Sequence, residues 1–159
     1  MVSVRTITLG DGSTVKVDAS DYKYLSQWKW QSAAGYAARS AYPAGMKGRG
    51  YRVLMHRQIT GCPEKLLVDH INHDTLDNRK ENLRIASASQ NQWNKRLMKN
   101  NKSGVTGVVW DPVNQKWRAS ITVKDKYISL GRYTVLEDAK KARLAGELEH
   151  FGEFARQAR

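Results

Sequence analysis

Alternating apolar and polar positions predict a β-rich start to the chain. Residues 1–17 alternate in this way on either side of Asp11-Gly12. Successive side chains of a strand point to opposite faces, and Asp-Gly is favoured in tight hairpin turns, so this segment predicts a β-hairpin. Four aromatic side chains follow, and we expect them in the core, because each part of the chain is too short to fold without large apolar groups. They are Trp28, Trp30, Tyr36 and Tyr42.

The middle of the chain combines strand patterns with one helix. Residues 51–59, YRVLMHRQI, form a short apolar run that fits either a strand or a helix. Residues 66–71 and 82–87 each predict a strand, and a polar loop separates them. A helix is expected to open at Ser89 and to reach about Lys99.

Two sites carry the spacing of a helix cap. Asn78 is followed three residues later by Glu81, and Thr134 is followed three residues later by Glu137. A side chain at the first position can accept from a backbone N–H of the first turn, and the acid can bond back to it. We therefore expect one capped helical turn after Asn78 and a longer capped helix after Thr134.

The last third of the chain predicts a small sheet with one helix across it. Residues 107–110, 116–123 and 127–133 read as three strands, and residues 135–151 read as a helix that ends before Gly152. The helix carries a slim face that allows close packing on a sheet. Its members are Ala139, Ala142, Ala145 and Leu148.

These elements predict an α+β protein in two parts. Residues 1–98 would hold a β-rich start, over residues 1–50, and a ββα unit. Residues 99–104 are polar and basic and predict a linker, and residues 105–159 would form a three-stranded antiparallel sheet packed on one helix.

The charge balance favours a polyanionic partner. The 159 residues carry 27 Lys and Arg against 15 Asp and Glu, a formal charge of +12. The largest excess lies in residues 93–133, just after the segment where carboxylates gather. Cys62 is the single cysteine, which excludes an intrachain disulfide and a cysteine-based zinc cage. No secretory signal and no apolar run of about 18–20 residues is present, so we expect a soluble cytoplasmic protein without a membrane partner.

Four residues are expected to meet at one end of the ββα unit. Asp69 and His70 end the first strand, Asn82 begins the second, and Asn91 lies in the first turn of the helix. Oxygen ligands from Asp69 and Asn91 suit Mg²⁺ or Mn²⁺, and the neighbouring imidazole can take a proton from water. A metal ion and a base beside a phosphate-sized gap predict a phosphodiesterase.

The same string resembles the HNH motif of the ββα-metal nucleases, in particular phage and intron homing endonucleases. His70 precedes Asn82 by twelve residues and Asn91 by twenty-one, which fits the family's intervals. The resemblance covers about residues 50–95. It implies His70 as general base, Asp69 and Asn91 as ligands of one divalent ion, and Asn82 as a brace that orients His70 through the loop backbone. It also implies products with 5′-phosphate and 3′-hydroxyl ends.

Other polar side chains near the motif have two interpretations. His56 could support the active site or cap a local turn, whereas His73 and His150 look like ordinary exposed residues. A group of cations could grip backbone phosphates or form a solvated charged face. They are Arg79, Lys80 and Arg84.

Residues 103–154 resemble the DNA-binding domain of the plant Apetala and ethylene-response transcription factors, through SGVTGVVW, KWRASI, LGRY, EDAKKAR and FGE. In residues 116–123 one face is apolar and the other basic and hydrogen-bonding, as a sheet laid in the major groove requires. The side chains expected at the DNA are Thr106, Val109, Lys116, Arg118, Ser120, Thr122, Lys124, Tyr127 and Ser129. Further cations that would follow the phosphates are Lys95, Arg96, Lys99 and Lys102.

The sequence therefore predicts a DNA endonuclease of homing or nicking type, with suspected phage or mobile-element origin. Its partner would be double-stranded DNA, and no small-molecule cofactor is expected. One centre per chain would cut one strand, and monomer and homodimer stay open. The alternative is a catalytically inactive, sequence-preferring DNA-binding protein. RNA binding is disfavoured, because no strand carries the run of aromatic side chains on which RNA bases stack.

Overall fold

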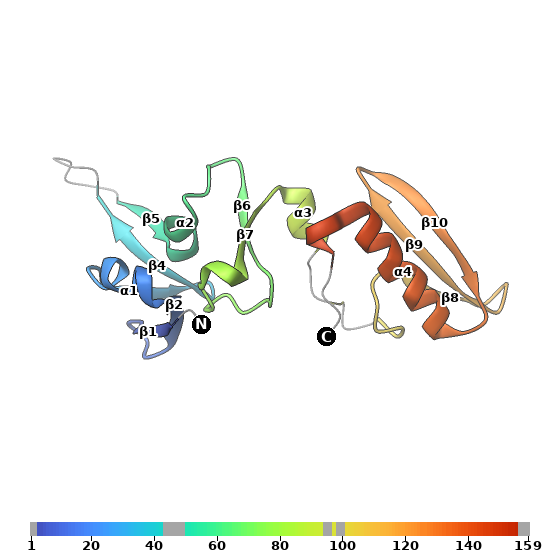
Figure 1. The fold of residues 1–159 in the computed structure, drawn as a ribbon, viewed down its shortest axis with the longest axis horizontal. Coiled ribbons are helices and arrows are strands. Elements are labelled where there is room, and N and C mark those ends of the chain that lie inside the picture. The colour runs from blue at the N-terminus through green and yellow to red at the C-terminus, as the bar shows by residue number, and fades with distance from the viewer. Residues whose placement is uncertain (1–2, 43–49, 94–96, 98–100, 156–159) are drawn as a thin grey trace. The chain divides into compact units, whose positions relative to one another are not determined.

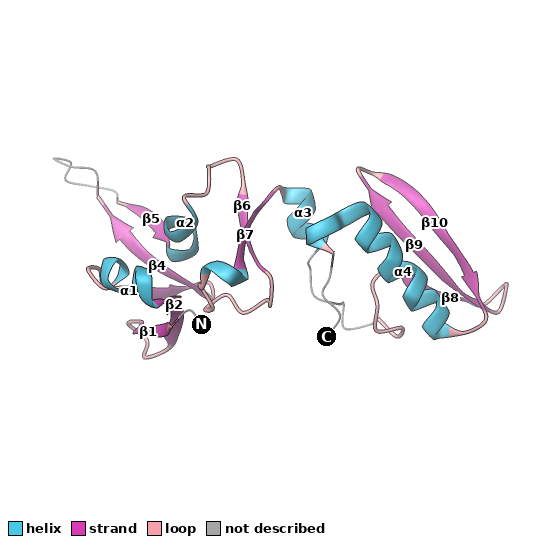
Figure 2. Cartoon of the chain, viewed as in Figure 1, coloured by secondary structure: helices cyan, strands magenta, loops and turns pink. Residues whose placement is uncertain are grey.

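The computed structural model describes residues 3–42, 50–93, 97 and 101–155. The chain divides into two compact units, Met1–Ala88 and Ser89–Arg159. Helices and several small sheets make it a mixed α+β protein, which confirms the predicted fold class (Figure 2).

The first unit holds three small antiparallel sheets, with strand orders β1-β2, β3-β4-β5 and β6-β7 (Figure 1). The predicted hairpin is present, and Asp11 closes its turn by accepting from the backbone N–H of Ser13. The elements are β1 (Val4–Thr8), β2 (Thr14–Asp18), α1 (Ala19–Leu25), β3 (Gln31–Ala33), β4 (Tyr36–Ala41), β5 (Tyr51–Leu54), α2 (Met55–Thr60), β6 (Leu67–His70), the 3-10 turn η1 (Lys80–Asn82) and β7 (Leu83–Ala86).

The ambiguous run of residues 51–59 contains both candidate structures. Its first half is β5 and its second half is α2. The helix ends at Gly61, which adopts a left-handed conformation with φ 61°. Arg57 then binds the backbone carbonyls of the next segment, at Cys62, Pro63 and Leu66. These bonds hold the chain in position as it enters β6.

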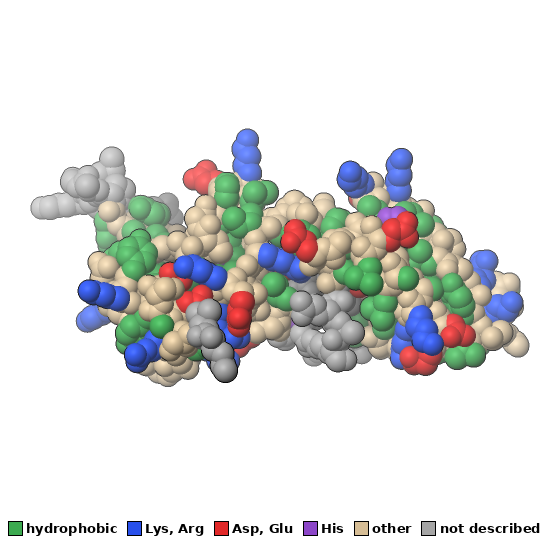
Figure 3. Space-filling view, viewed as in Figure 1, with side chains coloured by type: hydrophobic (Ala, Val, Ile, Leu, Met, Phe, Trp, Pro, Cys, Tyr) green, Lys and Arg blue, Asp and Glu red, His purple; other side chains and the backbone are tan. Residues whose placement is uncertain are grey.

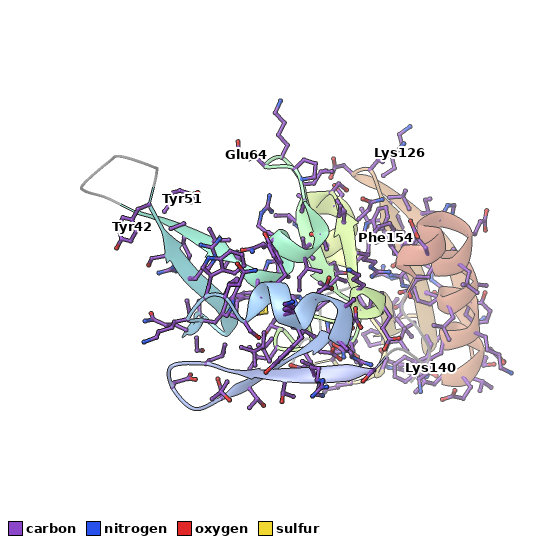
Figure 4. All side chains as sticks on the ribbon, turned by 60° about the vertical axis from the view of Figure 1, so that its left-hand side comes forward. Tyr42, Tyr51, Glu64, Lys126, Lys140 and Phe154 are labelled. Atoms are coloured by element: carbon purple, nitrogen blue, oxygen red, sulfur yellow. The ribbon has the colours of Figure 1, made fainter. Side chains whose placement is uncertain are left out.

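The N-terminal residues build most of the first core. Buried side chains of β1, β2 and α1 meet Trp30 and Met55 there. Trp30 also donates from Nε1 to the Leu25 carbonyl at 2.8 Å. Trp28 and Tyr36 are half-buried, but Tyr42 is 64% exposed, so its placement in the core was wrong. Tyr42 lies just past the end of β4, where the β4–β5 ribbon has run beyond the core (Figure 4).

The hairpin β1–β2 also holds the loop between β6 and β7. Lys16 donates its backbone N–H to Leu76 and accepts from Asn78, both at 2.8 Å. The carboxylate of Asp18 accepts from the backbone N–H of Lys80 at 2.9 Å. The role of residues 1–50 therefore includes completing the core and fixing the loop that follows His70.

The second unit contains the predicted three-stranded antiparallel sheet, with order β10-β9-β8, and α4 packed on it. Figure 1 shows the helix lying across the strands. Val108, Ala119 and Ala139 form the buried centre between the two layers. The elements are α3 (Ala88–Trp93), β8 (Val108–Asp111), β9 (Lys116–Val123), β10 (Lys126–Tyr133), α4 (Leu136–Phe151) and the 3-10 turn η2 (Gly152–Phe154).

The face that α4 turns to the sheet differs from the predicted one. Ala139 is buried and Ala142 is half-buried against the sheet, whereas Ala145 and Leu148 are exposed. Arg143, Gly146 and Glu147 are buried instead. The two charged residues of this group pair with each other at 3.0 Å, and Arg143 Nε donates to the Thr106 carbonyl at 2.7 Å. A buried ion pair thus occupies positions that lie outside the predicted apolar face.

The predicted cap of α4 is also absent. The residue that precedes the helix is Val135, and no side chain bonds the free N–H groups of the first turn. Glu137 pairs instead with Lys140, one turn along the helix, at 2.7 Å. The predicted span of the helix agrees with α4 to within one residue. The predicted capping box of Thr134 and Glu137 was wrong.

The segment between β7 and β8 includes α3 and residues that pack within the second unit. The helix that opens near Ser89 is described as far as Trp93, whose ring stacks on Phe151 with centroids 4.1 Å apart. Ser103 is buried and donates to the Val108 carbonyl at 2.7 Å, so part of the predicted linker, residues 99–104, packs within the second unit. In the described ranges, none of the helices combines the length and apolar character that a membrane crossing needs.

Candidate active site and nucleic-acid surface

Asp69 and His70 are buried side by side at the end of β6, with 6% and 5% of their surface exposed. Asp69 pairs across the ladder with Arg84, and His70 pairs with Leu83. Since side chains of a strand alternate, the carboxylate and the imidazole leave the hairpin on opposite faces. The candidate site is therefore built around the end of the strand.

His70 is surrounded by polar and aromatic side chains. Its Nε2 is 2.9 Å from Oδ1 of Asn78. The ring of His56 stands edge-on to it at a centroid distance of 5.2 Å, and Tyr36 lies 6.0 Å away. These three neighbours come from the loop after β6, from α2 and from β4. The imidazole is thus held by segments that are distant in sequence.

His56 is one of these neighbours, and it is 4% exposed. Burial lowers the pKa of His56 to about 4, and the positive charges that His70 and Arg57 can carry add to the shift. It lies within α2 and does not cap it, since the preceding residue is Leu54. Of the two interpretations of His56, the structure supports a place beside His70.

Asn78 does not cap the turn that follows it. The residue that precedes η1 is Arg79, whose side chain makes no capping bond, and the N–H of Lys80 donates to the Asp18 carboxylate instead. Asn78 is fully buried. Its N–H donates to the Lys16 carbonyl of β2, and its side chain bonds to His70. Within the described part of the chain its Nδ2 has no hydrogen-bond partner. The capping prediction at this position was wrong.

Asn82 joins both ends of the loop between β6 and β7. Its Oδ1 accepts from the backbone N–H of Asn72 at 3.0 Å, and its Nδ2 donates to the Asp77 carbonyl at 2.7 Å. Its backbone carbonyl also accepts from Ile71 at 3.0 Å. Three bonds from one buried residue therefore fix the path of the chain directly after His70.

The cations near the motif are paired with carboxylates. Arg84 binds Asp69 through two nitrogens at 2.7 and 2.8 Å, and Lys80 binds Asp21 at 2.8 Å. Arg79 makes two bonds of 2.7 Å to Asp77, and its guanidinium holds the pKa of that carboxyl below its ordinary value. Arg79 and Arg84 are thus half-buried, and each is the ion-pair partner of a carboxylate, Asp77 and Asp69 respectively.

The donor set fits a hard cation in chemical type. A carboxylate oxygen and an amide oxygen are ligands that Mg²⁺ and Mn²⁺ accept. Asp69 supplies the first, and Asn91 lies in α3, half-buried, in the second unit. A cation at Asp69 would share or replace the bond from Arg84. Among the residues that the structure describes, no three His, Cys, Asp or Glu side chains gather as a metal cluster.

The second unit exposes one polar face of its sheet. In β9 the apolar side chains Ala119 and Ile121 are buried, whereas Lys116, Arg118 and Thr122 are exposed. Ser120 on the same face is half-buried. The ladder register adds the residues directly opposite them, which point the same way. These are Val109 beside Arg118, Tyr127 beside Thr122, and Ser129 beside Ser120.

Arg132 belongs to this open face and was missed. Simple alternation from Tyr127 and Ser129 would turn it toward the helix. A register shift between Ser129 and Gly131 places Arg132 opposite Arg118 instead, and Asp111 pairs with it at 3.4 Å. A glycine inside a strand pattern is a signal of such a bulge.

The remaining predicted DNA contacts fall into two groups, those that the structure describes and those that it does not. Thr106, Lys102 and Lys124 are exposed, the last in the turn between β9 and β10 with φ 47°. Lys95, Arg96 and Lys99 lie outside the described residues. Lys and Arg side chains are exposed on both units (Figure 3).

Comparisons with known proteins point to the same segment. The model of a family described as HNH endonuclease matches residues 51–93. Protein 3.8 of Escherichia phage T7 is 34% identical over 75 residues, which cover 47% of this chain and 62% of that protein. A protein of Acanthamoeba polyphaga mimivirus, named uncharacterized HNH endonuclease L560, is 29% identical over 150 residues, or 92% of this chain and 75% of that protein. No solved structure matches the chain.

The matched segment begins at β5 and ends with α3, so it contains the buried pair Asp69 and His70 and both asparagines of the motif. The viral relative that carries the same family name aligns with nearly the whole chain. Residues 51–93 are therefore the part of this chain that is similar to HNH endonucleases.

Proposed function

We propose that the protein is a DNA endonuclease that hydrolyses phosphodiester bonds with one divalent metal ion. The observation that carries this proposal is the position of His70. It ends β6 inside the segment that is similar to HNH endonucleases, its ring is held by Asn78 and His56, and the loop behind it is pinned by Asn82. A fixed, buried imidazole suits the removal of a proton from a water molecule.

In this mechanism His70 acts as the general base. Asp69 and Asn91 would hold one Mg²⁺ or Mn²⁺ ion, which supplies charge neutralisation at the phosphate and at the leaving 3′ oxygen. Asn82 fixes the loop that carries the backbone past His70, and Arg84 keeps the Asp69 carboxylate in place before the ion binds. The products would carry 5′-phosphate and 3′-hydroxyl ends.

The second unit would position the DNA. Its open sheet face presents Lys116, Arg118 and Arg132 beside hydroxyl groups, which suits both phosphate contact and base reading in a major groove. The resemblance of residues 103–154 to the Apetala-type domain supports this role. A site-preferring enzyme of homing or nicking type follows, in which one unit binds and the other cuts.

Cleavage of supercoiled plasmid tests the proposal. With Mg²⁺ or Mn²⁺ we expect nicked circles first, since one centre cuts one strand, and EDTA should abolish the product. A rapid linear product would indicate a homodimer. His70→Ala should reduce the rate on the order of 10²-fold or more while DNA binding is retained. The matched control is His150→Ala in α4.

Two results would contradict the proposal. A His70→Ala protein that is as active as His150→Ala would remove His70 from the chemistry. Plasmid left intact by folded wild-type protein that still binds DNA in a salt-sensitive manner would favour a DNA-binding protein without nuclease activity.

A further inference from the structure

The ribbon formed by β4 and β5 ends in exposed aromatic and basic side chains. Its two strands are paired from Ala38 as far as Ala41 and Tyr51. Ala38 is 3% exposed near the base of the ribbon, whereas Tyr51 is 57% and Tyr42 is 64% exposed at the other end. Figure 4 shows both tyrosines at that far end, beyond the packed side chains of the first unit. The exposed end of the ribbon therefore contributes little to the core.

The sequence around the ribbon carries positive charge and no negative charge. Residues 22–63, which include all of β4 and β5, contain seven Lys and Arg and no Asp or Glu. Arg52 of β5 is exposed, and within the described part of the chain no carboxylate pairs with it. Arg79 and Arg84 of the same unit are each bound to a carboxylate. The charge of the ribbon is thus left for a polyanionic partner.

The ladder register gathers hydrogen-bonding side chains on one face of the ribbon. Ser40 lies directly opposite Arg52, so the two side chains point to the same face. Tyr42 is two residues beyond Ser40 and shares that face, because side chains alternate along a strand. A Cβ added at Gly50 would lie 2.8 Å from the Tyr42 ring. The ring therefore rests against the backbone of the neighbouring strand and turns its other side to solvent.

We propose that this face of the β4–β5 ribbon is a second DNA-contacting surface, carried by the same unit as His70. The inference rests on the proposed function and adds to it, since the DNA surface proposed above lies on the second unit. A two-stranded antiparallel ribbon fits the width of a major groove. The guanidinium of Arg52 and the hydroxyl groups of Ser40 and Tyr42 suit phosphate oxygens and base edges.

The base of the ribbon reaches the candidate active site. Tyr36 opens β4, and its ring centroid lies 5.1 Å from that of His56 and 6.0 Å from that of His70. Tyr42 follows Tyr36 by six residues. A strand advances about 3.3 Å per residue, so Tyr42 lies at most roughly 20 Å from Tyr36. The ribbon would therefore contact DNA within one helical turn, about 34 Å, of the bond that is cut.

Single substitutions test this contact without disturbing the core, because each side chain is exposed. Arg52→Ala removes the charge, and Tyr42→Ala removes the ring with its hydroxyl. The matched controls are Lys23→Ala and Tyr22→Ala, at exposed positions of α1 in the same unit. Lys23 also belongs to residues 22–63, so this control separates a position on the ribbon from the loss of one positive charge.

The anisotropy of a fluorescent DNA duplex, measured in EDTA, reports binding by the whole chain without cleavage. We expect Arg52→Ala to lower the slope of log affinity against log salt by about 0.9, as for one phosphate contact. The same decrease should appear in protein that already carries Arg118→Ala, because contacts on separate units add. Tyr42→Ala should weaken binding on the order of 10-fold, as for a hydrogen bond to a charged group. Both controls should match wild type.

Cleavage kinetics give a second readout. The ribbon would bind DNA at a distance from the bond that breaks, so Arg52→Ala and Tyr42→Ala should raise KM and leave kcat unchanged. A fall in kcat with unchanged KM in both variants would contradict a role in binding.

The outcomes distinguish this inference from the proposed function. A wild-type salt slope in a folded Arg52→Ala protein would overturn the inference, and so would an equal decrease with Lys23→Ala. Binding that depends on Arg52 and Tyr42 but is directed to phosphatidylserine vesicles, with none to the duplex, would overturn it as well. If Arg52→Ala weakens DNA binding but the wild-type protein does not cut plasmid, the nuclease proposal fails and the ribbon contact stands.

Discussion

The imidazole of His56 stands edge-on to that of His70, with ring centroids 5.2 Å apart and ring planes at 87°. Both rings are buried, and Tyr36 contacts both of them. Two protonated rings in this space would place two positive charges next to each other without water. The low pKa of His56, about 4, follows from that burial and from its charged neighbours.

This arrangement predicts a loss of stability in mild acid. Below pH 6.5 His56 of the unfolded chain takes up a proton, whereas His56 of the folded chain does so only near pH 4. The unfolded state then binds more protons, so the free energy of unfolding falls as the pH drops from about 6.5 to about 4. The contribution is about 3 kcal/mol for a shift of this size. Urea unfolding at several pH values measures it.

His56→Leu should remove most of that pH dependence, since leucine does not titrate. His150→Gln, at a half-exposed position of α4, is the control and should leave the slope unchanged. A His56→Leu protein with the wild-type slope between pH 6.5 and 4 would show that other groups cause the acid sensitivity.

The ion pair of Asp69 and Arg84 predicts competition with a metal ion. Arg84→Ala removes the positive charge that is paired with the buried Asp69 carboxylate, which should destabilise the metal-free protein by roughly 3 kcal/mol or more. Mn²⁺ should then raise the Tm of Arg84→Ala more than that of wild type, because the ion replaces the lost positive charge. Thermal melting with Mn²⁺ and with EDTA measures both effects.

Lys80→Ala is the control for this prediction, since its pair with Asp21 is more exposed and should contribute less than about 1 kcal/mol. An equal Mn²⁺ effect on Arg84→Ala and wild type would separate Asp69 from metal binding.

Gly107, directly before β8, is predicted to be the glycine of the second unit that is least tolerant of a side chain. It has φ 80°, and a Cβ there would overlap the Ser120 carbonyl oxygen and lie 2.7 Å from Arg143 Nε. Gly107→Ala should cost roughly 3 kcal/mol, from backbone strain and steric overlap together. Gly12→Ala, with φ 84° and open space around it, should cost about 1 kcal/mol. Equal costs in urea unfolding would contradict the close approach at Gly107.

The open face of the second sheet predicts a measurable salt dependence of DNA binding. Arg118 and Arg132 face each other across β9 and β10. If each neutralises one phosphate, Arg118→Ala and Arg132→Ala should each lower the slope of log affinity against log salt by about 0.9. Lys141→Ala, on the exposed side of α4, should leave it unchanged. A slope that falls only with Lys141→Ala would place the DNA on the helix face.

Local periodicity was sufficient to predict most elements of the fold. Alternation identified β9, whose partners follow from short turns, and the apolar run of residues 66–71 identified β6. It failed at residues 51–59, because the chain changes from strand to helix at Leu54 and a short window averages the two. The spacing of the HNH motif likewise predicted the segment that the family comparison matches.

Two of the errors concern polar side chains whose burial is decided by tertiary contacts. Asn78 has the spacing of a cap, but its partners are His70 and Lys16, and no local pattern contains them. Arg143 occupies a position that periodicity assigns to the solvent side, yet it is buried with Glu147 and the Thr106 carbonyl. Tertiary contacts decide such positions, because a buried polar group goes where its hydrogen bonds are made.

The stacking of Trp93 on Phe151 bears on whether the protein can be divided. Asn91 lies on the same short helix as Trp93, and Phe151 is the last residue of α4. A fragment that stops before α4 would expose the indole and leave a six-residue helix too short to persist alone. Transfer of residues 51–93 to another protein would therefore require a new aromatic partner for Trp93.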